Sequence, residues 1–270
     1  YVIANAPSHG TVQLSSSKGY LSFDGNDDYV EVPYSSDFNN FTDAISVSSW
    51  FKVANNGNDG NLTIIENGDS KGFVLGITTN SGKLSLNPHL KTSSGWFNLP
   101  YSIEGGLQYD TWYHGAFSYN GSDFKCYING QELSPNYSSA SVSGNIENNT
   151  QALSFGYDAN WQNYFSGQID EASVWNSALS ASEISALYNS GTTISPMSNS
   201  GNYVSSSSLK SYWTFNEGSG SVLTDQTSND HDGTINGPTW GTEVINNGSG
   251  STFAYSPTAN YHGTDTFTYT

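Results

Sequence analysis

Short acidic loops are the first segments of this sequence whose residue types could do chemistry. The loop DQTSNDHDG at 225–233 places side-chain oxygens at Asp225, Thr227 and Asn229, which are alternate positions before a glycine. A second acidic segment, FDGNDDY, lies at 23–29. Hard cations such as Ca²⁺ take about six to eight oxygen ligands from loops of this kind. We therefore predict one bound calcium ion. The alternative is that the carboxylates cap turns and face solvent.

Two tryptophans lie in polar, loop-like stretches and could bind carbohydrate. Trp96 lies in TSSGWFNLPYS and Trp161 in YDANWQNYF. Aromatic faces stack on the C–H surfaces of sugars, while amides and carboxylates hydrogen-bond to the hydroxyls. We predict a glycan-binding site here; the alternative is that one of the two indoles plugs an end of the fold. The predicted contact residues are Trp96, Tyr101, Trp161, Asn163, Tyr164 and His89, with Lys91 beside His89 as an outer candidate.

Sequence patterns of catalysis are missing. No G-x-S-x-G, H-E-x-x-H or glycine-rich phosphate loop occurs, and the five histidines are scattered. Asp170 and Glu171 are adjacent, so on a regular strand they would point to opposite faces and could not form the acid/base pair of a glycosidase. We predict a non-catalytic protein.

The charge balance narrows the choice of partner. The formal net charge is -17, and the seven basic residues are all lysine. Without a basic patch there is no footprint for nucleic acid or an anionic membrane. No apolar stretch of about 18 residues predicts insertion into a membrane. The expected ligand is a neutral sugar, or an anionic one held through calcium.

The local patterns are mostly those of β-strands. Phe124, Cys126 and Ile128 alternate with polar or aromatic neighbours, which predicts a strand with Cys126 buried. Asn-Gly and Asp-Gly steps punctuate the chain with hairpin turns, as at Asn129-Gly130. One helix is predicted after Ser180, where S-x-x-E forms a capping box and Ile184, Leu187 and Tyr188 form an apolar stripe. We expect this helix to pack over one end of a sandwich.

Four segments in order identify a family resemblance. They are GYLSFDGNDDYVEVP (19–33), AISVSSWFKV (44–53), DTWYHGAFSYNGSDFKCYINGQEL (110–133) and YFSGQIDEASVWNSALSASEISALYNSG (164–191). Together they resemble the laminin-G-like, concanavalin A-like lectin domain. The resemblance implies an all-β fold, an antiparallel β-sandwich or jelly roll. It also implies that most such modules bind glycans or other surfaces.

The same resemblance implies roles for particular residues. Members of the family often hold a structural calcium near the IDE strand, which points to Asp170, Asn216 and either Asp28 or Asp225, with Asn229 nearby. The family fills four tryptophan positions with core residues, which here are Trp50, Trp112, Trp175 and Trp213. Glycosidases on this fold carry an E-x-D-x-x-E run on a concave strand, and this sequence lacks it.

The chain ends predict a second, smaller unit. Residues 1–18 and 241–270 resemble consecutive pieces of one cadherin-like, immunoglobulin-like repeat, so residues 19–240 are interpreted as a sandwich inserted into a turn of that repeat. The alternative is two unrelated fragments of neighbouring repeats. Residues 209–240 resemble a segment that usually opens the lectin domain. They either supply circularly permuted strands or begin a second copy.

These observations predict a calcium-containing, polysaccharide-binding module of a larger secreted or cell-surface bacterial protein. It would tether that protein to glycan, with flanking repeats of the same polypeptide as neighbours. The first alternative is a structural spacer or protein-binding adhesion domain, for which Trp96 and Trp161 should both be buried. The second is a glycoside hydrolase or lyase, which requires carboxylates converging in a groove.

Overall fold

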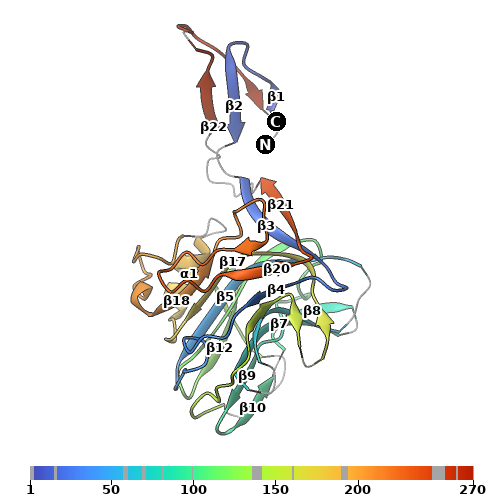
Figure 1. Cartoon of the computed structure of the whole chain (residues 1–270), viewed down its shortest axis with the longest axis vertical. Coiled ribbons are helices and arrows are strands. Elements are labelled where there is room, and N and C mark those ends of the chain that lie inside the picture. Colours follow the sequence, from blue (N-terminus) through green and yellow to red (C-terminus); the bar gives the residue numbers. More distant parts are fainter. Residues whose placement is uncertain are drawn as a thin grey trace.

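Two large antiparallel sheets pack face to face and enclose most of the apolar side chains (Figure 1). The computed structural model describes residues 3–14, 17–56, 60–68, 71–80, 82–98, 100–135, 142–159, 161–189, 194–244, 253–259 and 261–269. The prediction of an all-β, concanavalin A-like antiparallel sandwich is confirmed.

The first sheet has nine strands in the order β10-β9-β7-β6-β14-β4-β20-β19, with β8 paired to β7. The strands are β4 (Tyr29–Val32), β6 (Asn61–Asn67), β7 (Phe73–Asn80), β8 (Lys83–Leu86), β9 (His89–Thr92), β10 (Gly95–Asn98), β14 (Leu153–Phe155), β19 (Val222–Leu223) and β20 (Gly233–Asn236). A separate hairpin is formed by β15 (Tyr157–Asp158) and β16 (Asn163–Tyr164), which contact β6.

The second sheet has eight strands in the order β13-β12-β11-β5-β17-β3-β21, with β18 paired to β17. The strands are β3 (Ser17–Asp24), β5 (Ile45–Val53), β11 (Trp112–Tyr119), β12 (Phe124–Ile128), β13 (Gln131–Leu133), β17 (Ser166–Trp175), β18 (Leu209–Trp213) and β21 (Thr239–Val244). The Asn129-Gly130 turn joins β12 to β13 as expected, and both residues have positive φ angles of 50° and 73°.

The core lies between the sheets and is rich in aromatic rings. Trp213 and Phe215 are fully buried and meet the ring of Phe155 at 5.0 and 5.5 Å. Cys126 is also fully buried, and burial raises the pKa of its thiol. Because the two inner faces supply alternate residues of every strand, the period of two in the sequence predicted this burial correctly.

Helix α1 (Ala181–Tyr188) covers part of the outer face of the eight-stranded sheet. Ser180 accepts from the backbone N–H of Glu183, whose carboxylate accepts from the backbone of Ser180, so the predicted capping box is present. Ile184 and Leu187 of the helix pack with Trp175, a residue of β17 that points away from the main core. The helix therefore lies over a sheet face, where we had expected it over an end of the sandwich. A short 3₁₀ turn, η2 (Ser206–Ser208), precedes β18.

Residues 209–240 are integral to the sandwich. Strand β18 extends the eight-stranded sheet beside β17, whereas β20 joins the nine-stranded sheet beside β4. The segment thus supplies strands to both sheets. Strand β21, which follows β20, pairs with β3 from Thr239↔Ser22 to Val244↔Ser17. The eight-stranded sheet therefore extends beyond the predicted bounds of 19 and 240.

The two chain ends pair with each other outside the sandwich. Strand β1 (Ile3–Asn5) pairs with β23 (Thr268–Tyr269), and β2 (Gly10–Leu14) pairs in full register with β22 (Phe253–Pro257). Figure 1 shows these strands beyond β3 and β21, at the side where both termini lie. Along the sequence, the strands of the sandwich therefore lie between β2 and β22, which pair with each other. A cadherin-like identity for this small unit stays a prediction.

Asp265 joins the two ends at the start of β2. Its carboxylate accepts from the backbone N–H groups of Ser8 and His9, at 3.0 and 2.7 Å, and from the Ser8 hydroxyl at 3.1 Å. The rings of His9 and Tyr261 stack beside it at 4.4 Å. No helix among the described residues is long and apolar enough to cross a membrane.

We predict that the pairing of the ends weakens in acid because of Asp265. Desolvation raises its pKa, but the hydrogen bonds from His9, Ser8 and Thr266 outweigh this effect and lower the pKa to about 2. The folded pKa lies below the unfolded value of about 3.9, so the contribution is complete above pH 4 and is lost as the pH falls towards 2.

Amide hydrogen exchange of β2 and β22 measures this effect. Protection should fall between pH 4 and 2 in the native chain, and Asp265→Asn should lower it already at neutral pH. Glu104→Gln, at an exposed carboxylate of the sandwich, is the control. Equal protection in Asp265→Asn and the native chain would contradict the prediction.

Candidate functional site

A cleft with a volume of about 390 Å³ contains both tryptophans that the sequence singled out. It lies on the outer face of the nine-stranded sheet, between the β9–β10 hairpin and the turn of the β15–β16 hairpin. We call it the tryptophan cleft; its lining residues are Asn61, His89, Lys91, Trp96, Asn98, Asp158 and Trp161.

Strand alternation explains how β9 and β10 place four side chains in the cleft. Leu90 and Phe97 are cross-strand partners and point into the core. Their neighbours must therefore point outward, and the register sets Trp96 opposite Lys91 and Asn98 opposite His89. The Trp96 and His89 rings meet edge to face, with centroids 5.6 Å apart.

His89 is itself held in place by a hydrogen bond to a neighbouring side chain. Its side chain is buried, and its Nε2 accepts a hydrogen bond from the Asn87 amide at 3.0 Å. The imidazole therefore supports the Trp96 ring and lines the cleft. This support matters because a fixed ring loses little conformational entropy when a ligand stacks on it.

Trp161 stands at the tip of a braced hairpin. The Asp158 carboxylate accepts from the Trp161 backbone N–H at 2.9 Å, and the Asp158 carbonyl accepts from Gln162 at 2.8 Å. Gln162 takes a positive φ of 54° to close this turn. Below it, the rings of Tyr157 and Tyr164 stack at 4.6 Å. The turn is thus built by hydrogen bonds and stacking that leave the indole of Trp161 outside.

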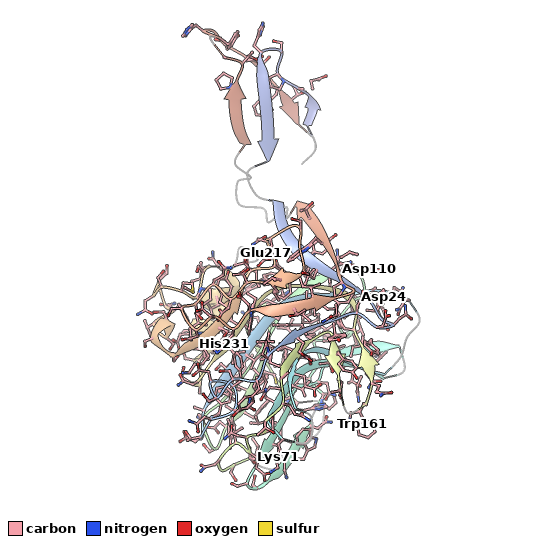
Figure 2. All side chains as sticks on the ribbon, in the orientation of Figure 1. Asp24, Lys71, Asp110, Trp161, Glu217 and His231 are labelled. Carbon is pink, nitrogen blue, oxygen red and sulfur yellow. The ribbon has the colours of Figure 1, made fainter. Side chains whose placement is uncertain are left out.

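Both indoles are exposed, although the elements that carry them are well packed. Trp161 is 71% exposed and Trp96 is 40% exposed. Figure 2 shows Trp161 projecting from the ribbon into solvent. A spacer or adhesion domain had been expected to bury both, and the structure does not do so. Large apolar rings kept in water on rigid supports are typical of a binding surface.

Some predicted contact residues lie apart from the cleft. Tyr101 is 3% exposed and belongs to the core, because its backbone pairs with Leu86 and carries the ring inward; we correct its assignment. Asn163 and Tyr164 form β16 and brace the Trp161 turn without lining the cleft. Sequence reasoning missed Asn61 and Asp158. The D-x-x-W spacing of an Asx-type turn was the available signal for Asp158.

The predicted calcium ligand Asp225 is occupied by donors of the chain itself. Its two oxygens accept from the backbone N–H groups of Tyr212, Thr227 and His231 and from the hydroxyls of Ser211 and Thr227, at 2.8 to 3.1 Å. With five donors already in place, this carboxylate holds the loop 225–233 against β18. Its contacts are those of the turn-capping alternative, and a calcium role for Asp225 stays a prediction.

The other predicted ligands do not converge on one point. Asn216 accepts from the Gly19 backbone at 2.6 Å, and the Asn229 amide donates to the carbonyl of Lys210 at 2.8 Å. Asp170 is buried near Tyr212 on the outer face of the other sheet. Asp28 alone lies in an acidic group, where it brings a ligand oxygen within 4.8 Å of those of Asp24 and Asp27.

Asp28 is the buried member of this group, and Asp24 and Asp27 are exposed. Burial raises the pKa of Asp28, and the negative charges of Asp24 and Asp27 raise it further, although the Asp24 backbone N–H donates to it at 2.8 Å. Oxygen donors that repel one another at a surface turn have the chemistry that Ca²⁺ prefers.

Asp170 and Glu171 lie on the same side of β17, which corrects the expectation that they point to opposite faces. A β-bulge interrupts the register between Asp170 and Ser173, and Glu171 has a φ of 50°. Burial raises the pKa of Tyr212, and the charges of Glu171 and Asp170 raise it further, so both carboxylates lie near this phenol. They are only 3% and 7% exposed, hence closed to a polymeric substrate.

Comparison with known proteins gives a family and two similar structures. Residues 24–185 match the family described as the concanavalin A-like lectin/glucanases superfamily. A proposed carbohydrate-binding protein from Bacteroides ovatus is 20% identical with a TM-score of 0.60, over 84% of this chain and 60% of the other. A heptameric SAP-like pentraxin from Limulus polyphemus is 14% identical with a TM-score of 0.50, over 90% and 96%. No curated protein matches significantly.

We predict that Asp158 positions Trp161. Asp158→Ala removes the acceptor of the Trp161 N–H, which should destabilise the turn by about 1 kcal/mol. Asp158→Asn keeps a carbonyl oxygen at the same place and should restore it. Measured by ¹⁵N relaxation, the Trp161 amide should become mobile in Asp158→Ala but not in Asp158→Asn. Equal order in all three proteins would contradict this role.

Proposed function

Because this chain belongs to the concanavalin A-like lectin/glucanase superfamily, we propose that its tryptophan cleft binds carbohydrate without cleaving it. The observation that carries the proposal is the pair of exposed indoles, Trp96 and Trp161, on separate rigid hairpins of one cleft. Aromatic rings supply stacking surfaces for sugar C–H groups, and the amides of Asn61 and Asn98 face the same space for the hydroxyls.

The charges in the cleft favour a neutral saccharide. The cation, Lys91, lies 3.8 Å from the carboxylate of Glu147, which also lies 4.0 Å from Lys71. Asp158 adds a negative charge at the opposite wall. An anionic sugar would therefore meet a cation that is already paired and a carboxylate that repels it. The net charge of -17 adds to this repulsion.

The buried environment of Asp170 and Glu171 supports binding over hydrolysis. A retaining or inverting glycosidase needs two carboxyl groups that both reach the scissile bond. Here Glu171 instead accepts a hydrogen bond from the Tyr212 hydroxyl. We infer a non-catalytic module that tethers a larger secreted or cell-surface protein to polysaccharide. The similar Bacteroides ovatus protein, which is itself proposed to bind carbohydrate, is consistent with this role.

We further propose that calcium is held at Asp24, Asp27 and Asp28. The ion would neutralise the repulsion among the three carboxylates, which adds to the effect of burial in raising the pKa of Asp28, and would stiffen the β3–β4 turn. This assignment retains Asp28 from the predicted ligands. The other predicted ligands are engaged in hydrogen bonds within the fold or lie apart from this turn.

We expect the two tryptophans to dominate the affinity for glycan. Loss of one stacked ring removes about 1 kcal/mol or more, so Trp96→Ala and Trp161→Ala should each weaken binding on the order of tenfold. Isothermal titration calorimetry against soluble neutral polysaccharides (mixed-linkage β-glucan, galactomannan, arabinan and dextran) measures the effect.

Tyr34→Ala is the matched control for these variants. Tyr34 is also an exposed aromatic residue, 51% exposed, but it does not line the cleft. Binding by Tyr34→Ala should equal that of the native chain. If every polysaccharide binds the tryptophan variants and the native chain equally, the cleft is not the binding site.

Calcium should raise the melting temperature of the sandwich by roughly 5 °C at a hundredfold excess over its dissociation constant. Since the pKa of Asp28 is raised, this gain should vanish as the pH falls through that pKa and the carboxyl takes up a proton. Differential scanning calorimetry measures both effects. Asp27→Asn, at an exposed position, should reduce the gain, and Asp225→Asn should destabilise the fold without changing it. An unchanged melting temperature with calcium would refute the site.

A further inference from the structure

A second hollow, of about 440 Å³, lies between helix α1 and the β12–β13 turn. It is on the outer face of the eight-stranded sheet, where α1 packs, and the tryptophan cleft is on the outer face of the other sheet. We call it the α1 pocket. The residues that matter to its chemistry are Asn129, Gln131, Ser185, Tyr188, Asn189 and Asn202.

The α1 pocket is lined by neutral hydrogen-bonding groups. Four of its residues are amides, and the residues that line it include no Asp, Glu, Lys or His. Gln131 and Asn202 are exposed, and among the described residues their amides make no hydrogen bond. Each such amide offers two donors and one acceptor, which is the set that a sugar hydroxyl pairs with.

Its walls are fixed by the surrounding fold. Asn129 exchanges two hydrogen bonds with the backbone of His114: its side-chain oxygen accepts at 2.9 Å and its N–H donates at 2.8 Å. Asn189 ends the helix with a φ of 44°, and its N–H donates to the Ser185 carbonyl. The Asn129 amide and the backbone at Asn189 therefore stay in place when a ligand arrives, which reduces the entropic cost of binding.

An aromatic ring with rigid support completes the pocket. Tyr188 stacks on Trp50 with centroids 5.7 Å apart and an interplanar angle of 30°, and His114 lies 6.2 Å from it. Trp50 and His114 are buried in the sheet and support one side of the Tyr188 ring. Another part of the ring lines the pocket. The tryptophan cleft combines the same parts, a supported aromatic ring with amides around it.

We propose that the α1 pocket is a second saccharide-binding site, selective for a neutral sugar unit. The absence of charge among its lining residues excludes strong selection for uronate, sulfate or amino groups. With sites on both outer faces, one sandwich binds two glycan segments and links them. Two linked sites raise avidity without any new contact.

The test uses the whole chain and three variants. Ser185→Trp fills the pocket from the exposed side of α1, and Gln131→Ala/Asn202→Ala removes two amides without touching the core. Ser207→Trp places the same bulk on an exposed serine outside the pocket and is the control. The probes are cello-, manno- and arabino-oligosaccharides. ¹H–¹⁵N chemical-shift mapping locates where each probe binds, and calorimetry gives the number of sites per chain.

We expect two sites per chain in the native protein and in Ser207→Trp. Ser185→Trp should leave one site, and the amide double variant should weaken that second site on the order of tenfold. Light scattering with soluble galactomannan should show cross-linking that Ser185→Trp abolishes. Shifts confined to the tryptophan cleft with every probe, and one site in all variants, would overturn the proposal.

The outcome separates this proposal from the function of the tryptophan cleft. If Trp96→Ala/Trp161→Ala keeps the shifts around Tyr188 and retains one site, the α1 pocket binds sugar on its own. If the same double variant loses all binding, including the shifts around Tyr188, the α1 pocket is not a site. If no probe shifts the resonances of the tryptophan cleft while Ser185→Trp abolishes binding, the α1 pocket is a saccharide site and the function assigned to the cleft fails.

Discussion

The return of residues 209–240 into the sandwich is the constraint on which the rest of the fold depends. Trp213 is fully buried between the sheets, and its indole N–H donates to the His231 carbonyl at 2.9 Å. Asp225 gathers five donors at the far end of the same loop and fixes it against β18. A buried carboxylate must be satisfied in this way, because an unpaired one would cost several kcal/mol. The acidic loop that suggested calcium thus completes the core, and β19 and β21 then form one edge of each sheet.

A closed core leaves the outer faces available for recognition. On the nine-stranded sheet, alternation sends Leu90 inward and His89 outward, so one hairpin both fills the core and carries Trp96. On the eight-stranded sheet, α1 covers part of the outer face and supports Tyr188 over Trp50. In both places a ring is held from behind by other rings, and amides surround it. Rigid aromatic surfaces of this kind bind with little loss of side-chain entropy.

A local irregularity decides what the acidic residues of β17 can do. The bulge at Glu171 turns two adjacent carboxylates towards Tyr212, where a regular strand would have separated them. Their burial makes them part of the packing, and the group of three acidic residues that gathers among the described residues lies at the β3–β4 turn. Saccharide binding and the calcium site are therefore assigned to the surface. The buried polar contacts of the interior specify the fold.

The sequence by itself determined the fold class, the α1 capping box, the burial of Cys126 and the choice of Trp96 and Trp161. The fold class follows from the resemblance of four segments to a known family. The others follow from local rules: a period of two, an S-x-x-E start and aromatic residues in polar stretches. Only the tertiary structure decided that the two tryptophans share one cleft, that Tyr101 lies in the core and that Asp225 is saturated. It also decided the pairing between β2 and β22, strands about 240 residues apart. Such facts depend on strand order and pairing, and a short window of sequence contains neither, because its residues do not record which distant strand lies beside them.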